Sequence, residues 1–244
     1  MKNTINYLLH LADNSLIMAQ RLSEWCGHGP ILEQDIALSN IALDYVGQAR
    51  NLYQYAAELK GEGTTEDSLA YLRNDREYLN CLLVELPNGD WAQTVLKIFF
   101  FSSYQYYLYQ QLRQNGDERI AAIAEKSLKE VSYHLKWSSE WVIRLGDGTA
   151  ESKRRMEMAI PELWSFTGEL FEPVEYESGF TDPAQLKDSW NKKVETIFHE
   201  ATLPVPAVTT WFQSGGKSGI HTEHLGYILA EMQVLQREHP GATW

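Results

Sequence analysis

Cysteine, proline and glycine are scarce in this chain, which has 2 cysteines, 8 prolines and 16 glycines in 244 residues. Cys26 and Cys81 form neither a CxxC pair nor a disulfide framework, so we expect a reducing compartment. Few chain-breaking residues leave long uninterrupted segments with helical apolar spacing, and no segment of useful length alternates as a strand does. The scarcity of breakers therefore favours an all-α fold.

Basic charge is also in short supply, with 21 Lys and Arg against 33 Asp and Glu and a net charge of −12. This balance argues against nucleic-acid binding, which needs a basic face. The N-terminus is not typical of a signal peptide, because Asp13 interrupts its apolar run. The most apolar stretch, TVLKIFFFSSYQYYLY, contains Lys97 and is shorter than the roughly 20 residues of a membrane span. We expect a cytoplasmic protein that binds neither nucleic acid nor membrane.

The helical periodicity predicts one domain over residues 1–244, built as a ferritin-like four-helix bundle with one long crossover. The core helices are expected at residues 4–26, 31–60, 90–114 and 117–145, and additional C-terminal helices at 151–171, 182–201 and 222–238. A shorter helix is expected in the crossover, near 66–83.

A histidine in the fourth long segment suggests a metal site that has lost its ligands. Ferritin-like di-iron proteins carry a Glu-x-x-His pair on each of two helices. Here the residue three before His134 is Val131, and Glu130 lies at the rim of the same apolar stripe. The alternative is a buried histidine satisfied by a polar partner.

The second and third long segments show the same loss. The pair that would match Glu-x-x-His in the second segment is Asp44 and Gly47, although these residues also fit a solvated polar face. The third segment has no carboxylate between Trp91 and Leu112. Because iron needs several oxygen donors, we predict no metal on this chain, and only vestigial metal-centre positions.

The segment SGGKSGIHTEHLG is the other candidate site. A Gly-rich loop before a helix can receive a phosphate, which makes Lys217 a candidate contact, although a flexible turn with a solvated lysine also fits. His221, Glu223 and His224 cluster there but lack a further zinc ligand. The alternative is a hydrogen-bond network at a helix start capped by Thr222.

Aromatic residues fall all around the third long segment, so that helix should be buried on every side. Either the C-terminal helices cover these rings or a partner protein does, and we favour a partner interface. The rings are Phe99, Phe100, Phe101, Tyr104, Tyr106, Tyr107 and Tyr109.

Longer blocks resemble a known family over nearly the whole chain. They include LADNSLIMAQRLSEWCGHGPILEQDIALSNIALDYVGQARNLYQYAAELKGEG, ELPNGDWAQT, KSLKEVSYHLKWSSEWVIRLGDGT, LWSFTGELF and GGKSGIHTEHLGYILAEMQVLQR. These blocks resemble the C subunits of the bacterial phenylacetyl-CoA epoxidase complexes, within the ferritin-like multicomponent monooxygenases.

The resemblance implies a structural subunit without catalytic residues in aerobic phenylacetate degradation. It implies a partner A subunit that holds the di-iron centre and binds the acyl-CoA. It also implies other epoxidase subunits, including a reductase with FAD and an iron–sulfur cluster that takes electrons from NADPH. The reaction implied is ring 1,2-epoxidation with O₂. Lys217 would then be a candidate contact for a CoA phosphate in the partner. The competing hypotheses are an active di-iron oxygenase with atypical ligands and a free-standing binding module.

Overall fold

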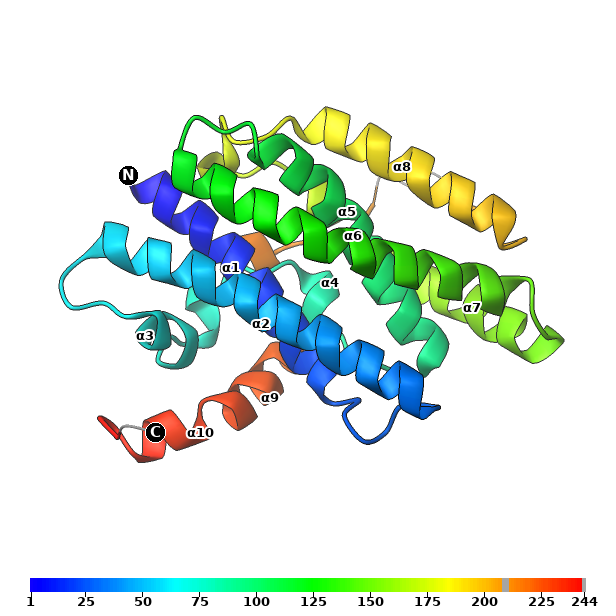
Figure 1. Ribbon diagram of the computed structural model, residues 1–244, viewed down its shortest axis with the longest axis horizontal. Coiled ribbons are helices and arrows are strands. Elements are labelled where there is room, and N and C mark those ends of the chain that lie inside the picture. The colour runs from blue at the N-terminus through cyan, green and yellow to red at the C-terminus, as the bar shows by residue number, and fades with distance from the viewer. Residues whose placement is uncertain (208–210, 243–244) are drawn as a thin grey trace. The chain divides into compact units, whose positions relative to one another are not determined.

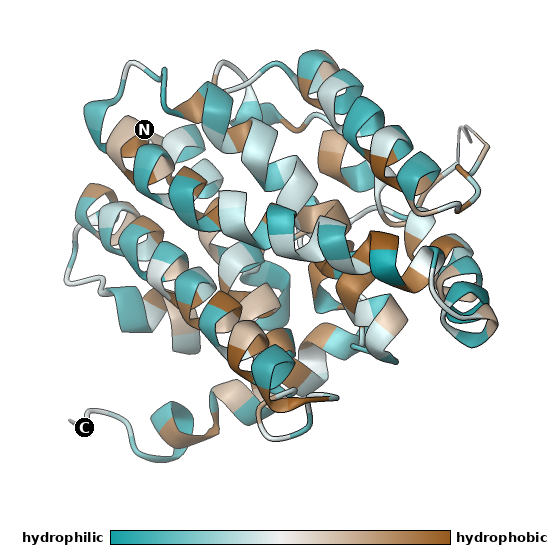
Figure 2. Ribbon diagram, turned by 45° about the vertical axis from the view of Figure 1, so that its right-hand side comes forward, coloured by the Kyte–Doolittle hydropathy of each residue, from teal (hydrophilic) through white to brown (hydrophobic). Residues whose placement is uncertain are grey.

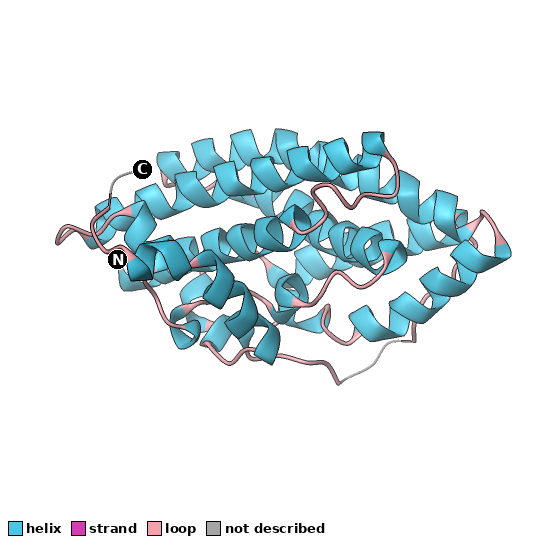
Figure 3. Cartoon of the chain, turned by 90° about the horizontal axis from the view of Figure 1, so that it is seen from below, coloured by secondary structure: helices cyan, strands magenta, loops and turns pink. Residues whose placement is uncertain are grey.

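The computed structural model describes residues 1–207 and 211–242, and every regular element in these ranges is a helix (Figure 1, Figure 3). The prediction of an all-α chain is confirmed, and the order of its helices is consistent with a ferritin-like fold. Contacts divide the chain into two compact units, Met1–Pro87 with Ser214–Trp244, and Asn88–Gln213. Within the described ranges, no helix is both long and apolar enough to cross a bilayer.

The first unit is built on a hairpin of two long helices that pack along each other. Its helices are α1 (Lys2–Ser23), α2 (Leu32–Lys60), α3 (Glu66–Tyr71), α4 (Leu82–Glu85), α9 (Glu223–Met232) and α10 (Val234–Glu238). α1 also contacts α4 and α9, so elements from both ends of the chain meet on it.

The second unit is a hairpin of two further long helices with two more packed on it. Its helices are α5 (Trp91–Leu112), α6 (Glu118–Gly146), α7 (Ala150–Trp164) and α8 (Pro183–Glu200). α5 contacts all three of the others. This arrangement gives the second unit α5 as its central helix.

Capping chemistry explains why the long helices begin and end where they do. The Asp90 carboxylate accepts a hydrogen bond from the backbone N–H of Gln93 at 3.0 Å. The Asp117 carboxylate accepts one from the backbone N–H of Ile120 at 3.2 Å. Gly61 ends α2 with φ at 67°, a conformation that favours glycine. The expected boundaries of the four core helices therefore agree with the structure to within a few residues.

The shorter helices differ from the predicted ranges. The expected helix at 66–83 is replaced by α3, a single 3₁₀ turn at Asp75–Glu77 and the start of α4. The chain leaves α3 at Leu72 because the next residue, Arg73, turns inward to bind Asp13. The helix expected at 151–171 ends at Trp164, whose carbonyl accepts the Thr167 hydroxyl at 2.8 Å.

The last helix is also interrupted. The range expected as one helix, 222–238, is broken at Gln233. The side chain of Gln233 donates to the Arg73 carbonyl at 2.9 Å and to the Tyr78 hydroxyl at 3.0 Å. The break therefore occurs at the residue that ties this segment to the crossover.

The aromatic rings of α5 are packed mainly by the chain itself. Phe100 lies 5.7 Å from Trp164 and 5.6 Å from Trp190, measured between ring centroids, and the Trp190 indole donates to the Phe100 carbonyl at 2.9 Å. The buried rings are Phe99, Phe100, Phe101, Tyr104 and Tyr109, whereas Tyr106 and Tyr107 are half-buried. The expectation that a partner covers these rings is wrong for the buried ones; α7 and α8 wrap α5 instead.

Candidate functional site

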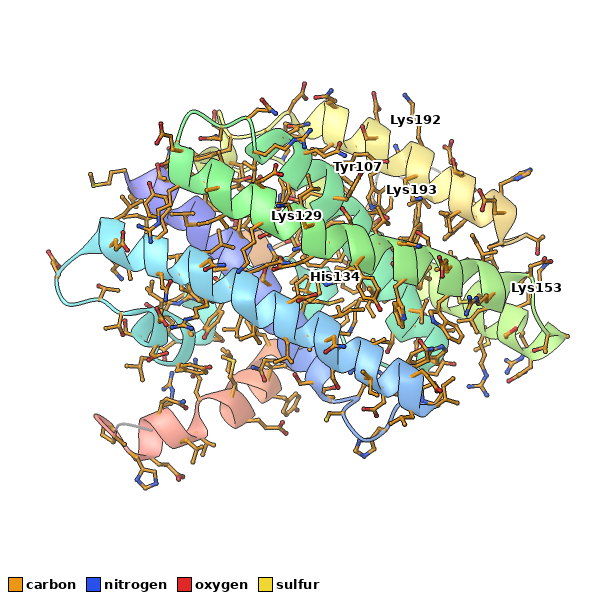
Figure 4. All side chains as sticks on the ribbon, viewed as in Figure 1. Tyr107, Lys129, His134, Lys153, Lys192 and Lys193 are labelled. Carbon is orange, nitrogen blue, oxygen red and sulfur yellow. The ribbon has the colours of Figure 1, made fainter. Side chains whose placement is uncertain are left out.

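The α6 pair singled out from the sequence lies on the buried face of its helix. Val131 and His134 are both fully buried, and Glu130 beside them is half-buried. Figure 4 shows the place of His134 on α6. The Ser138 hydroxyl, one turn on, donates to the His134 carbonyl at 2.8 Å, and its oxygen lies 3.3 Å from the Ser102 hydroxyl of α5. The histidine therefore faces the interior, where a valine stands three residues before it.

The α2 pair lies differently. Asp44 and Gly47 are half-buried, and a Cβ added at Gly47 would meet no atom within 4 Å. The residues of α2 that are fully buried next to them are Tyr45 and Gln48, which are also three apart. Asp44 and Gly47 thus lie beside the buried face, and the inward pair carries no charged oxygen donor.

The residues present do not fit a di-iron centre. Such a centre in this fold uses a carboxylate from each of four helices and two histidines. α5 has no Asp or Glu between Trp91 and Leu112, and α6 offers only His134 at the expected spacing. Over the described ranges, no group of three or more His, Cys, Asp or Glu side chains is placed to hold a metal ion.

Lys217 lies in a short turn that is pressed against the crossover. Its side chain is only 3% exposed. A Cβ at Gly216 would lie 2.2 Å from the Asn80 carbonyl oxygen, and one at Gly219 would lie 2.3 Å from the Arg76 carbonyl oxygen. The glycines are therefore required by close packing, and the burial of Lys217 does not favour the expected phosphate contact or a solvated turn.

His221 is held by two acceptors from the crossover. Its Nδ1 lies 2.8 Å from Glu85 Oε2, and its Nε2 lies 2.9 Å from the Tyr78 carbonyl oxygen. The Thr222 amide donates to the other oxygen of Glu85 at 2.7 Å. Because neither the carboxylate nor the carbonyl can donate, both ring nitrogens must carry hydrogen for both contacts to form. This geometry selects the charged imidazolium.

The electrostatics of His221 agree with its geometry. Burial lowers the pKa of His221, but the hydrogen bond and charge of Glu85 outweigh burial, and the net pKa is raised. Glu223 is exposed and His224 is half-buried, and no metal-binding group among the described residues includes them with His221. Thr222 caps α9 by accepting the His224 amide at 3.3 Å, as the sequence predicted.

A larger polar cluster, which the sequence analysis did not identify, surrounds Asp13 on α1. The Tyr53 hydroxyl donates to Asp13 at 2.5 Å, the Leu79 amide donates at 2.8 Å, and the Arg73 guanidinium forms a buried ion pair with both carboxylate oxygens. Burial and the Asp13 charge raise the pKa of Tyr53. The one sequence signal was an aspartate inside an apolar run.

Both polar clusters fasten one segment to another. The Asp13 cluster ties the crossover to α1 and α2, and the Glu85–His221 pair ties the segment before α9 to the crossover. Their polar atoms are used in bonds within the chain, which is typical of buried networks that fix a structure. Both clusters therefore hold these segments in position.

Two comparisons with known proteins agree. A family model described as "Phenylacetic acid catabolic protein" matches residues 1–244. The chain is 47% identical, over 250 residues, to the C subunit of the 1,2-phenylacetyl-CoA epoxidase of Escherichia coli (strain K12), and the match covers 100% of both chains. The chain belongs to the phenylacetic acid catabolic protein family.

Proposed function

We propose that this chain is the non-catalytic C subunit of a cytoplasmic phenylacetyl-CoA epoxidase and that it pairs with and stabilises a di-iron A subunit. The observation that carries the proposal is the match, over the whole of both chains, to a protein named as the C subunit of that enzyme. On this proposal the chain takes part in aerobic phenylacetate degradation without a cofactor of its own. The A subunit holds the di-iron centre, and a reductase with FAD and an iron–sulfur cluster supplies electrons from NADPH.

The residues of the buried helix faces support a structural role. Val131 is buried three residues before His134, where the Glu-x-x-His pattern would have a carboxylate, and the buried pair on α2 is Tyr45 and Gln48. Burying carboxylates without a metal costs free energy, so a subunit without chemistry gains by replacing them. The competing proposal, an active di-iron oxygenase with atypical ligands, requires oxygen donors that α5 does not have.

Reconstitution of the epoxidase tests this proposal. We expect a mixture of the purified A subunit, the reductase and the other epoxidase subunits to lack phenylacetyl-CoA epoxidation when this chain is omitted, and to regain it when the chain is added. A His134→Gln variant that still joins the complex should restore the same rate, because His134 takes no part in the reaction. Full activity without the chain, or an intact complex that is inactive with His134→Gln, would contradict the proposal.

A further inference from the structure

One face of α2 is apolar and open to solvent. It is formed by Leu32, Ile36, Leu43 and Val46, which are 71%, 51%, 66% and 42% exposed. At 100° per residue these four side chains fall within an arc of about 80°, along about 21 Å of helix. We call them the α2 stripe. Figure 2 shows more hydrophobic colouring in the first half of this helix than in the second.

The α2 stripe is unlike the scattered apolar residues of an ordinary surface. The opposite side of the same helix is already apolar and buried, through residues such as Leu38, Ile41 and Leu52. A helix that is apolar on two faces is typical of one covered on both. Ser39 lies between Ile36 and Leu43 on this face, so the stripe is interrupted by one small polar residue. Exposed apolar side chains gathered on one face of a helix in this way mark an interaction site.

Gly47 lies at the end of the stripe and gives an independent observation. Glycine is among the least favourable residues in a helix interior. A Cβ at Gly47 would meet no atom within 4 Å, so the packing of this chain does not require a glycine there. A half-buried glycine at the edge of an exposed helix face lets another backbone approach closely. The position therefore suits contact with a second helix.

The charged residues beside the stripe indicate which kind of partner helix could bind there. One rim of α2 carries Glu33, Asn40, Asp44, Asn51 and Glu58 at helical spacing, with no cation among them. This acidic rim and the net charge of −12 disfavour a second copy of the chain and favour a partner with a basic flank.

We propose that the α2 stripe is the docking surface for a helix of the catalytic A subunit, which approaches most closely at Gly47 and faces the acidic rim with basic residues. This inference rests on the proposed function, since it names the surface through which the two subunits pair. The contact joins apolar surface at its centre and charge at its edge, as interfaces between subunits commonly do.

The test measures the affinity of this chain for the purified A subunit by isothermal titration calorimetry. Leu43→Glu places a charge in the stripe, and we expect it to raise the Kd by about 100-fold. Gly47→Leu adds a side chain where the two helices would approach most closely, so it should raise the Kd by about tenfold. The melting temperature of the isolated chain should stay unchanged or rise, because leucine favours a helix more than glycine does. Glu33→Lys should slow association, measured by surface plasmon resonance at low salt, because it reverses a rim charge.

Met158→Glu is the matched control. Met158 is an exposed apolar residue on α7 and is not part of the stripe, so its variant should keep the Kd within about twofold. Equal effects of Leu43→Glu and Met158→Glu would overturn the docking surface while leaving the subunit assignment intact. A homodimer that Leu43→Glu dissociates would show that a second copy is the occupant. Failure of the wild-type chain to bind the A subunit would overturn both proposals.

Discussion

Asp13→Ala is expected to lower the free energy of unfolding by about 3–5 kcal/mol, because it leaves the buried Arg73 guanidinium without its counterion. The Tyr53 hydroxyl and the Leu79 amide lose an acceptor at the same time. Urea denaturation followed by circular dichroism measures the loss. The crossover should become sensitive to protease in the same variant, since Arg73 and Leu79 are the crossover residues that Asp13 holds.

An exposed ion pair provides the control for Asp13. The Nε atom of Arg50 lies 3.1 Å from Oε1 of Glu66 on the surface of the same unit. Arg50→Ala should cost less than about 1 kcal/mol, because water screens an exposed pair. Similar losses for Asp13→Ala and Arg50→Ala would show that the buried cluster does not anchor the crossover.

Glu85→Gln is expected to cost about 3 kcal/mol near pH 6, because it removes the charge that pairs with a buried imidazolium. The effect should depend on pH. The folded-state pKa of His221 is raised above its ordinary value of 6.5. The stabilisation is therefore fully present below pH 6.5 and is lost as the pH rises through the raised pKa.

A double-mutant cycle isolates the Glu85–His221 pair. Glu85→Gln, His221→Gln and the double variant are unfolded with urea at several pH values between 6 and 9, and the coupling energy is taken from the four proteins. The coupling energy should be largest at the acidic end and should decline towards the alkaline end. Besides Glu85, Asp13 also acts on the charge of His221. A coupling energy that is constant across this range would contradict the imidazolium assignment.

The long helices could be predicted from the sequence because local signals define them. Apolar periodicity and turn residues place α1, α2, α5 and α6 to within a few residues. The crossover could not be predicted in the same way. It breaks between α3 and α4 because Arg73 reaches Asp13, which is 60 residues away in sequence. Long-range contacts of this kind leave no periodic pattern in one sequence.

The candidate site could likewise be predicted only where local sequence signals determine it. The burial of Val131 and His134 follows from their helical register, and the structure confirms that burial. Helical register did not predict which pair of α2 residues faces inward. The buried pair is Tyr45 and Gln48, whereas Asp44 and Gly47 are half-buried beside it. The Gly-rich loop around Lys217 looked like a phosphate contact, but its glycines serve close approaches to Asn80 and Arg76 that only tertiary structure reveals.

Iron analysis of the purified chain tests the proposed structural role most directly. The chain is expressed alone in iron-supplemented medium, and its metal content is measured by plasma mass spectrometry beside the A subunit prepared in the same way. We predict iron in the A subunit and only substoichiometric, chelator-removable iron in this chain, because Val131 and the carboxylate-free α5 leave too few donors. About two tightly bound irons per chain, the content of a di-iron centre, would contradict the proposal.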